Sequence, residues 1–479
     1  MRVKHPPILM ISMLLTLPAA PFNHCIQAAQ DQEEIQRLTL EQCLEIALAR
    51  NPLRPASQYA IEAAEARQNQ ARSTWWPQID AGAAATVLDQ APQFLFPAST
   101  VPIPALPLGG MSLELPPFQV PEQKVKLMDR RNLLTSLSLT YPLYTGGLLS
   151  SLRRQADSGV EIAKQEARHT ELEIMFEVKS RYYGAVLARC MRELAEEAVA
   201  RLSATLDLTE NLYLKGSGRV KKTDFLKNKM VVESARSILA GLKDKEELAR
   251  AALLFSLGME SGSPVELADT EIPYESLKMA PEKTLETALR LNPDWGKFQS
   301  ILEIFEAKIA QARSSHFPKV AVIGRLNVMT NEYDYGMMAP ENRQLWMAGV
   351  GLEIPLFNGF RTRNKVKETR ARLAQLRQNG IAFREGISLR IKQLCGRMNA
   401  LEANESCARA AMEAAVENQD LTERAYQIEA VTEEDLIEAQ ILASLMRARY
   451  LAVRYEHYTT GAELDKVVGA EIVNLLGKQ

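Results

Sequence analysis

The sequence has few of the residues that build metal and redox sites, with five cysteines and five histidines in 479 residues. No two cysteines form a CxxC pair, and Cys43, Cys190, Cys395 and Cys407 all fall in helical patterns. Isolated cysteines in helices are usually small buried hydrophobes. The histidines are scattered, and HExxH, GxSxG and phosphate-loop motifs are absent. The sequence therefore predicts no disulfide framework, no metal site, no cofactor and no enzyme activity.

Excess charge and long apolar runs are also lacking. The 57 basic residues are balanced by 59 acidic ones, so the basic footprint typical of a nucleic-acid-binding protein is missing. Beyond residue 30 no 18 consecutive residues are apolar, which predicts no spanning helix there. Residues 1–29 carry a positive start, a short apolar stretch and small residues before position 30. This is typical of a secretory signal peptide, with an uncleaved anchor as the alternative.

Proline is missing from two long stretches, 143–263 and 356–479. Both are rich in Ala, Leu, Glu, Arg and Lys, which are strong helix formers. Each stretch is interrupted once, so each predicts a helical hairpin. The expected arms are 148–214 and 222–258 in the first stretch, and 361–428 and 432–460 in the second. An arm of about 66 residues would be about 100 Å long.

Short phrases of the sequence occur twice. LEIALARNP (44–52) matches LETALRLNP (285–293), and YPLYTGG (141–147) matches IPLFNGF (354–360). We therefore expect two tandem repeats, 30–275 and 276–479, each opening with two short helices that meet at Asn-Pro. The first repeat has 28 additional residues within 88–128, where eight of the 23 prolines lie. Because proline lacks the N–H that a strand ladder needs, this segment predicts a long irregular loop.

Each repeat also predicts two strands, at about 78–88 and 129–143 and at about 319–330 and 345–356. Apolar residues alternate with polar or small ones along the second strand of each pair, which is typical of a membrane β-strand. A half-buried strand of a soluble sheet has the same pattern. Four strands leave open edges that lipid does not tolerate, whereas three copies of the chain would close a twelve-stranded barrel.

The repeated phrase after each second strand predicts the junction between strand and helix. Pro142 and Pro355 would end the ladders where a missing N–H matters least, and Gly146, Gly147 and Gly359 would allow the bend. The second copy has Phe360 where the first has Gly147, so we expect the two bends to differ.

These features resemble the TolC family of outer-membrane efflux and secretion channels. The resemblance rests on the Asn-Pro after the first helix, the P-x-(Y/F)-x-G after a strand and the Y…DLIEAQ of the second hairpin, each in the family's order. It implies an α+β membrane protein: a homotrimeric twelve-stranded β-barrel in the outer membrane of a Gram-negative bacterium, continued by a twelve-helix tunnel into the periplasm. It also implies a periplasmic adaptor protein and an inner-membrane transporter as partners, in a tripartite efflux pump or a type I secretion system.

The alternative from another class is a periplasmic or secreted coiled-coil scaffold without a pore. The cargo leaves no signature in the sequence, so drugs, metals and polypeptides all remain open.

The resemblance also implies a gate at the periplasmic end. Asp435 and Glu438 lie one helical turn apart, and in a three-fold tube each becomes a ring of carboxylates that attracts cations. The family's upstream tyrosine and Thr-Asp pair match Tyr426, Thr223 and Asp224. An ordinary solvated helix face is the alternative for the acidic pair.

Two positions depart from the family pattern, since Glu429 and Val431 stand where the family often has glycine and arginine. Whether the gate is closed at rest is therefore left open. The turn of the first hairpin is expected to dock the adaptor, with a solvated turn as the alternative. Its residues are Gly216, Gly218, Arg219, Lys221 and Lys222.

Overall fold

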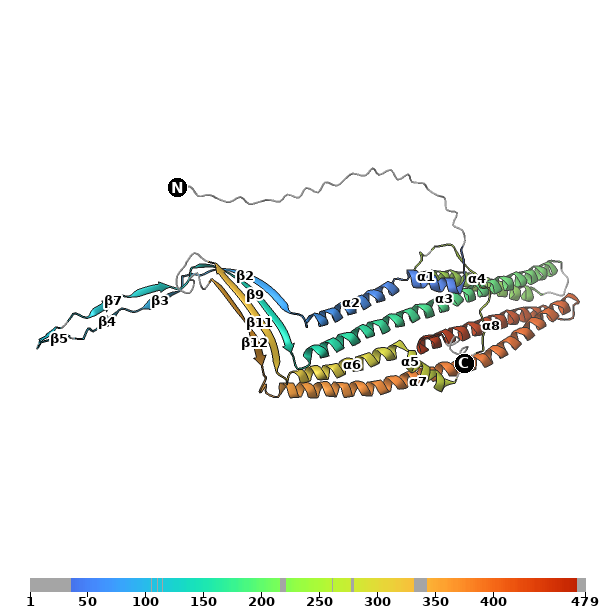
Figure 1. The fold of residues 1–479 in the computed structure, drawn as a ribbon. Coiled ribbons are helices and arrows are strands. Elements are labelled where there is room, and N and C mark those ends of the chain that lie inside the picture. Colours follow the sequence, from blue (N-terminus) through green and yellow to red (C-terminus); the bar gives the residue numbers. More distant parts are fainter. Residues whose placement is uncertain are drawn as a thin grey trace, which may run out of the picture.

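The computed structural model describes residues 36–471 except 105, 110, 114, 216–220, 261, 277–279 and 331–342. The signal peptide expected at 1–29 lies outside this part. The molecule is elongated, with the strands at one end and bundled helices running away from them (Figure 1). No helix in the described ranges combines the length and the apolar character needed to cross a membrane.

Four long helices form two antiparallel hairpins. They are α3 (Leu148–Leu214) with α4 (Lys222–Leu257), and α7 (Arg361–Gln427) with α8 (Glu433–Val468). The 67 residues of α3 and of α7 correspond to about 100 Å each. Helix α8 continues eight residues past the expected end at 460. Its terminus is set by Gly469 in the left-handed conformation, not by Gly461, which the helix accommodates.

The asparagine of each Asn-Pro motif connects a pair of short helices to the end of a long helix by a hydrogen bond. Helix α1 (Leu40–Arg50) precedes α2 (Leu53–Ser73), and α5 (Pro281–Leu291) precedes α6 (Pro293–Ser314). Asn51 Nδ2 donates to the Ser256 carbonyl of α4 at 3.1 Å, and Asn292 Nδ2 donates to the Val467 carbonyl of α8 at 2.8 Å. Each asparagine thus satisfies one of the carbonyls that a helix end leaves without a partner. The motif is therefore a helix cap as well as a boundary.

Four strands form one antiparallel sheet in the order β12–β11–β9–β2. They are β2 (Gln78–Val87), β9 (Arg131–Tyr144), β11 (Lys319–Thr330) and β12 (Gln344–Glu353). Residues opposite each other in the register share a face of the sheet. The register aligns Ile79 with Leu139, Leu137 with Leu326, and Leu326 with Trp346. One face is therefore apolar across all four strands, and the edges of β2 and β12 have no neighbour within the described chain.

The two strand-to-helix junctions correct two expectations. Pro142 lies inside β9, opposite Ala321 and beside a register irregularity, whereas Pro355 follows the end of β12. Proline is accommodated at such an irregularity because the ladder is already disrupted there. The bends themselves share one conformation, because Gly147 and Phe360 are both left-handed, at φ 86° and 61°. This backbone region is unfavourable for phenylalanine, and the Phe360 ring packs edge-on against Phe357, three residues earlier in the chain.

Residues 88–128 are not an irregular loop. They form a two-stranded antiparallel ribbon in three segments that projects beyond the sheet (Figure 1). The pairs are β3 (Gln93–Phe96) with β8 (Gln123–Lys126), β4 (Ser99–Val101) with β7 (Phe118–Val120), and β5 (Leu106–Leu108) with β6 (Met111–Leu113). Most prolines fall between the segments, and Pro107 lies in a strand with a free edge. Proline therefore divides the ladder without preventing it.

Two apolar clusters hold the helices together. The first joins α1, α3 and α4 with a small parallel sheet of β1 (Gln36–Leu38) and β10 (Val265–Leu267), and the second joins α5, α7 and α8. Cys43 and Cys395 are buried in these clusters, as expected. Burial raises the pKa of Cys43 to about 12, so its thiol stays protonated. Cys407 is exposed, contrary to expectation, because it lies on an outward face of α7.

A buried histidine of α8 makes stability depend on pH. Desolvation holds the pKa of His457 below its ordinary value of about 6.5, although Glu402 and Glu405 act in the opposite direction. The Tyr274 ring lies 4.7 Å from its ring. The unfolded chain binds the proton at a higher pH than the folded chain, so stability should fall as pH drops through about 6.5.

Replacing the ring with a neutral amide, His457→Gln, should remove this part of the acid sensitivity. The measurement is the free energy of unfolding in detergent at about pH 7 and about pH 5.5, which bracket the ordinary histidine pKa. An identical loss of stability in the two proteins over that interval would contradict the assignment.

Candidate functional site at the hairpin tips

The tips of the two hairpins lie side by side at the end of the molecule farthest from the strands (Figure 1). A groove of about 1190 Å³ runs between them, and all four long helices contribute to it. Its lining combines apolar and charged side chains. Representative lining residues are Leu208, Leu212, Met230, Tyr426, Ile437 and Glu438.

The structure brings the expected gate residues to this end of the molecule. Asp224, Tyr426 and Glu438 line the groove, whereas Thr223 and Asp435 lie in the first turns of α4 and α8 outside its lining. Partial burial raises the pKa of Tyr426, and the charge of Glu433 adds to that shift. The phenol therefore stays neutral and available as a hydrogen-bond donor.

The expected docking turn is described only in part. Lys221 lines the groove as the N-cap residue of α4, and Lys222 begins that helix. Gly216, Gly218 and Arg219 lie outside the described residues.

Asp224 and Asp435 have the same local role. Asp435 Oδ2 accepts from the Thr432 backbone N–H at 2.9 Å and from its hydroxyl at 2.6 Å, and Thr432 Oγ1 accepts from the Asp435 N–H in return. This is a capping box, and these bonds hold the pKa of Asp435 below its usual value. Asp224 Oδ2 accepts from the Lys221 N–H at 3.0 Å. Each carboxylate thus caps the first turn of its own helix, and its charge remains at the exposed tip.

Glu429 occupies a position that demands a left-handed backbone, with φ of 63°. Glycine adopts this conformation without steric cost, which accounts for glycine at this position in the pattern that the sequence resembles. In this chain two backbone hydrogen bonds close the turn, from the Glu429 N–H to the Tyr426 carbonyl at 3.0 Å and from the Ala430 N–H to the Ala425 carbonyl at 2.9 Å. The departure at 429 therefore changes the charge of the tip but not its backbone.

A hydrogen-bonded cluster that the sequence did not reveal joins the two tips. Glu433 Oε1 accepts from Asn228 Nδ2 at 2.7 Å and from the Thr209 hydroxyl, and Asn228 Nδ2 also reaches Thr209 Oγ1 at 3.2 Å. Asn228 and Thr209 are completely buried. One carboxylate of α8 thus satisfies polar groups of both arms of the other hairpin.

Farther from the tips than this cluster, ion pairs join the two hairpins. Arg201 of α3 contacts Glu423 of α7 at 2.9 Å, and Arg447 of α8 contacts Glu197 of α3 at 3.1 Å. Partial burial would raise the pKa of Glu197, but hydrogen bonds and charges from Arg201 and Arg447 lower it on balance. These half-exposed pairs fix the register of the hairpins more than they add stability.

The only sequence signal for the cluster is weak. Thr209 and Asn228 are polar residues on the inward faces of long amphipathic helices, and Glu433 sits in the acidic run TEED beside the predicted Asp435. Nothing in the sequence says which carboxylate of that run turns inward, because the answer depends on how α3, α4 and α8 meet.

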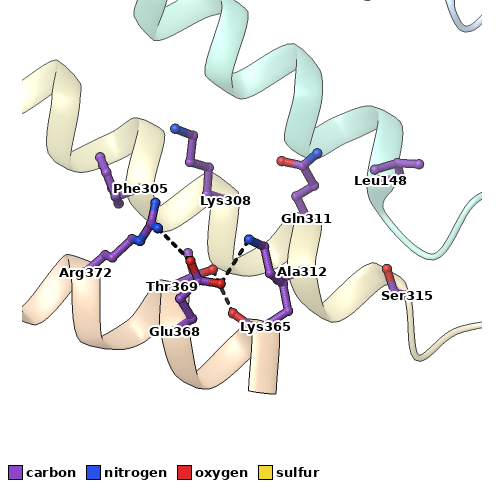
Figure 2. A pocket seen from close by; sticks show the side chains of 10 residues that line it. All are labelled: Leu148, Phe305, Lys308, Gln311, Ala312, Ser315, Lys365, Glu368, Thr369 and Arg372. Atoms are coloured by element: carbon purple, nitrogen blue, oxygen red, sulfur yellow. Dashed lines mark hydrogen bonds and ion pairs between the residues drawn. The ribbon is translucent and has the colours of Figure 1, made fainter. Parts of the chain in front are cut away.

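A second hollow, of about 380 Å³, lies at the opposite end of the helices between α6 and α7 (Figure 2). Lys365 and Arg372 contact Glu368 at 3.0 and 2.7 Å, and these cations hold the pKa of Glu368 below its usual value. Lys308 lies over the Phe305 ring at 4.8 Å. The charged groups satisfy one another, and no nucleophile with a neighbouring base lines the hollow.

In the part of the chain that the structure describes, no group of three histidine, cysteine, aspartate or glutamate side chains could hold a metal ion. The acidic side chains of Asp224, Asp435 and Glu438 lie at the end of the molecule where the two hairpins meet.

Comparison with known proteins identifies the family. The sequence profile of the family described as "Outer membrane efflux protein" matches residues 43–259 and 284–470. The chain is 26% identical over 247 residues to protein CyaE of Bordetella pertussis, covering 50% of each chain. It is 23% identical over 242 residues to the alkaline protease secretion protein AprF of Pseudomonas aeruginosa, covering 49% of this chain and 48% of AprF. The chain thus spans about half the length of the curated relatives it matches.

Solved structures show the same fold. The crystal structure of CusC, described in terms of folding and transmembrane channel formation, superposes with a TM-score of 0.72 over 90% of this chain and 92% of that one. Their sequences are 17% identical, so this likeness concerns the fold alone.

Proposed function

Because the chain belongs to the outer membrane efflux protein family, we propose that it forms a channel-tunnel through which cargo leaves the cell. The single observation that carries the proposal is the apolar face shared by four strands whose outer edges have no neighbour among the described residues. Such a sheet is stable in lipid only when it closes. The family match supports this reading over a pore-less coiled-coil scaffold. In the proposed arrangement the strands lie in the outer membrane and the helices in the periplasm.

The proposed assembly is a homotrimer with a twelve-stranded barrel and a twelve-helix tunnel, in which each chain contributes two tandem repeats. Closure would join the β2 edge of one copy to the β12 edge of the next. The proposed partners are a periplasmic adaptor that meets the hairpin tips at Lys221 and Lys222, an inner-membrane transporter, and outer-membrane lipid. AprF favours type I secretion over drug efflux as the working hypothesis, since it is described as a protease secretion protein.

Extraction tests the assembly directly. Membranes containing the protein should release it only with detergent, as a trimer whose gel band moves to the position of the monomer when the sample is boiled. Release by osmotic shock without detergent would refute the channel and favour the scaffold.

The proposal also includes a gate at the periplasmic end of the tunnel. It assigns Tyr426, Thr223, Asp224, Asp435 and Glu438 to the closed end of the tunnel. Its support is that all five lie at the hairpin tips and that Glu438 and Asp435 are exposed there.

Neutralising both carboxylates, Asp435→Asn with Glu438→Gln, should lower the cation selectivity of the channel in planar bilayers several-fold, because each ring loses three charges. Asparagine keeps the oxygen that caps α8, so the tip should stay folded. Glu417→Gln, at an exposed position farther along α7, is the matched control. Equal reversal potentials in all three proteins would remove the acidic pair from the gate.

A further inference from the structure

The charges of the long molecule are separated between its two ends. The three helical turns next to the sheet contain eleven basic and four acidic residues, and we call them the basic belt. They are residues 63–73 of α2, 148–158 of α3, 304–314 of α6 and 361–371 of α7. The three turns of each long helix at the hairpin tips contain four basic and ten acidic residues. They are residues 204–214 of α3, 222–232 of α4, 417–427 of α7 and 433–443 of α8. The near-neutral net charge of the chain thus conceals a strongly positive region beside the sheet.

An exposed aromatic side chain lies at the helix end of each strand of the four-stranded sheet. These residues are Trp76 before β2, Tyr144 at the end of β9, Phe317 before β11 and Phe357 after β12. Aromatic side chains gather at the boundary between the hydrocarbon of a membrane and water. The basic belt therefore begins where the hydrocarbon around the proposed barrel ends, and it extends for about 16 Å at 1.5 Å per residue.

A hollow of about 210 Å³ between α2 and α3 combines a cationic with an aromatic lining. Its lining residues are Arg72, Trp75 and Arg153. Asp157 lies 3.9 Å from Arg72 and 3.7 Å from Arg153, so a single carboxylate serves two guanidinium groups at the limit of ion-pair distance. Guanidinium groups match the geometry of phosphate oxygens, and an indole ring is at home among lipid headgroups. The hollow therefore has the charge and the aromatic surface that suit the phosphate of a lipid headgroup.

The first turns of α7 carry cations on both sides of the stripe that packs against α6. Thr362, Val366 and Thr369 form this buried stripe. At 3.6 residues per turn, two rows of basic residues flank it, and all six side chains are exposed. The first cation row is Arg363, Lys367 and Arg370, and the second is Arg361, Lys365 and Arg372.

Closure of the tube places one of these rows on the outside. In the proposed trimer α6 and the next copy occupy two opposite sides of α7, so one row faces the lumen and the other faces outward. The second row shares a single carboxylate, Glu368, and Lys308 of α6 lines the same hollow (Figure 2). The outer surface of the belt is therefore positive whichever row faces outward.

We propose that the basic belt binds the headgroups of anionic phospholipids in the leaflet that surrounds the helix ends of the strands. Basic clusters beside a membrane attract anionic lipids over about one Debye length, roughly 10 Å, which is within the extent of the belt. Arginine and lysine bind the lipid phosphates, and the aromatic residues lie at the level of the ester groups. This inference rests on the proposed channel, because it requires the strands to cross the membrane, and it assigns a lipid class and a set of residues to that contact.

Lipid retention by the intact trimer tests the proposal. The trimer is inserted into vesicles of equal parts phosphatidylglycerol and phosphatidylcholine with identical acyl chains. It is then extracted in a mild uncharged detergent, and the retained lipids are quantified by mass spectrometry. We expect a several-fold excess of phosphatidylglycerol that disappears when extraction is done in about 1 M salt, where the Debye length is about 3 Å.

Retention of the two lipids in equal amounts at low salt would overturn the proposal while leaving the channel intact. A chain that does not insert into the vesicles as a trimer would instead refute the proposed channel. The two failures are therefore distinguishable.

Variants with the same loss of charge locate the contact. Replacing either cation row of α7 with glutamine gives two triple variants, and at least one of them should lose most of the excess of phosphatidylglycerol. The matched control is Lys229→Gln, Lys243→Gln and Lys245→Gln, which removes three exposed cations from α4 in the far half of the molecule (Figure 1). This control should retain the excess.

Two results of the variant series count against the belt. Retention that is unchanged in both row variants would exclude α7 as the lipid contact, and a change in channel selectivity alone would show that its cations act on the lumen. An equal loss in the α4 control would show that net charge, and not the position of the cations, governs retention.

Discussion

Glu433→Ala is expected to separate the two hairpin tips and to raise the conductance of the closed channel several-fold. The alanine removes the acceptor of one amide N–H of Asn228, which is completely buried, whereas the Thr209 hydroxyl keeps the Thr205 carbonyl as acceptor at 2.8 Å. An unsatisfied buried polar group costs about 1–3 kcal/mol, so the contact between α8 and the first hairpin should weaken by about that amount. Single-channel recording in planar bilayers measures the effect.

The neighbouring residue supplies the control. Glu434 is in the same acidic run, but its side chain is 80% exposed and contacts only Lys227, at 3.6 Å. Glu434→Ala should therefore change conductance little, because exposed ion pairs contribute little. Glu433→Gln keeps an acceptor oxygen and should fall between the two. Equal conductance in the alanine variants at 433 and 434 would exclude the buried cluster as the fastening of the tips.

Gly469→Ala is expected to destabilise the protein more than any other single methyl addition considered. Gly469 ends α8 with φ of 87°, and a Cβ there would collide with the Leu291 carbonyl oxygen and lie 2.8 Å from its carbonyl carbon. The left-handed backbone alone costs an alanine about 1–2 kcal/mol. The collision is with the backbone next to Asn292, which cannot rotate away, so the total should reach about 3 kcal/mol or more.

Gly359 separates the two causes. It has a similar φ of 63°, but a Cβ there would meet open space. Gly359→Ala should therefore lose only the conformational part, about 1–2 kcal/mol. Denaturant unfolding in detergent, followed by circular dichroism, compares the variants. Equal losses at 359 and 469 would show that the contact with Leu291 does not contribute.

The long helices could be predicted because their cause is local. A stretch without proline and rich in helix formers has few alternatives to a helix, and one interruption in it makes a hairpin. The end of α8 could not be predicted from the sequence. Gly461 fits inside the helix, whereas α8 ends at Gly469, which lies against the Leu291 carbonyl. The ribbon at 88–128 was missed for a related reason. Proline weakens a ladder only where its N–H is needed, and in a two-stranded ribbon many positions face outward.

In the candidate site, too, some residues could be located from the sequence and others could not. Tyr426, Asp224 and Asp435 could be located at the tips because their spacing from the helix breaks is local, and the capping box of Asp435 can be read from Thr432 three residues earlier. Glu433 could not be chosen over its acidic neighbours, since its partners are more than 200 residues away in the chain.

The sequence by itself determined the class of this protein: two proline-free helical hairpins, alternating strands and the repeated junction phrases identify a member of the outer membrane efflux family. These are local patterns of period, propensity and spacing, which do not depend on distant contacts. Only the tertiary structure decided that Asn51 and Asn292 cap the long helices, that Gly147 and Phe360 share one bend, and that Glu433 fastens the tips. The asparagine caps and the Glu433 contacts depend on where two segments far apart in the chain meet, and local propensity does not encode that position.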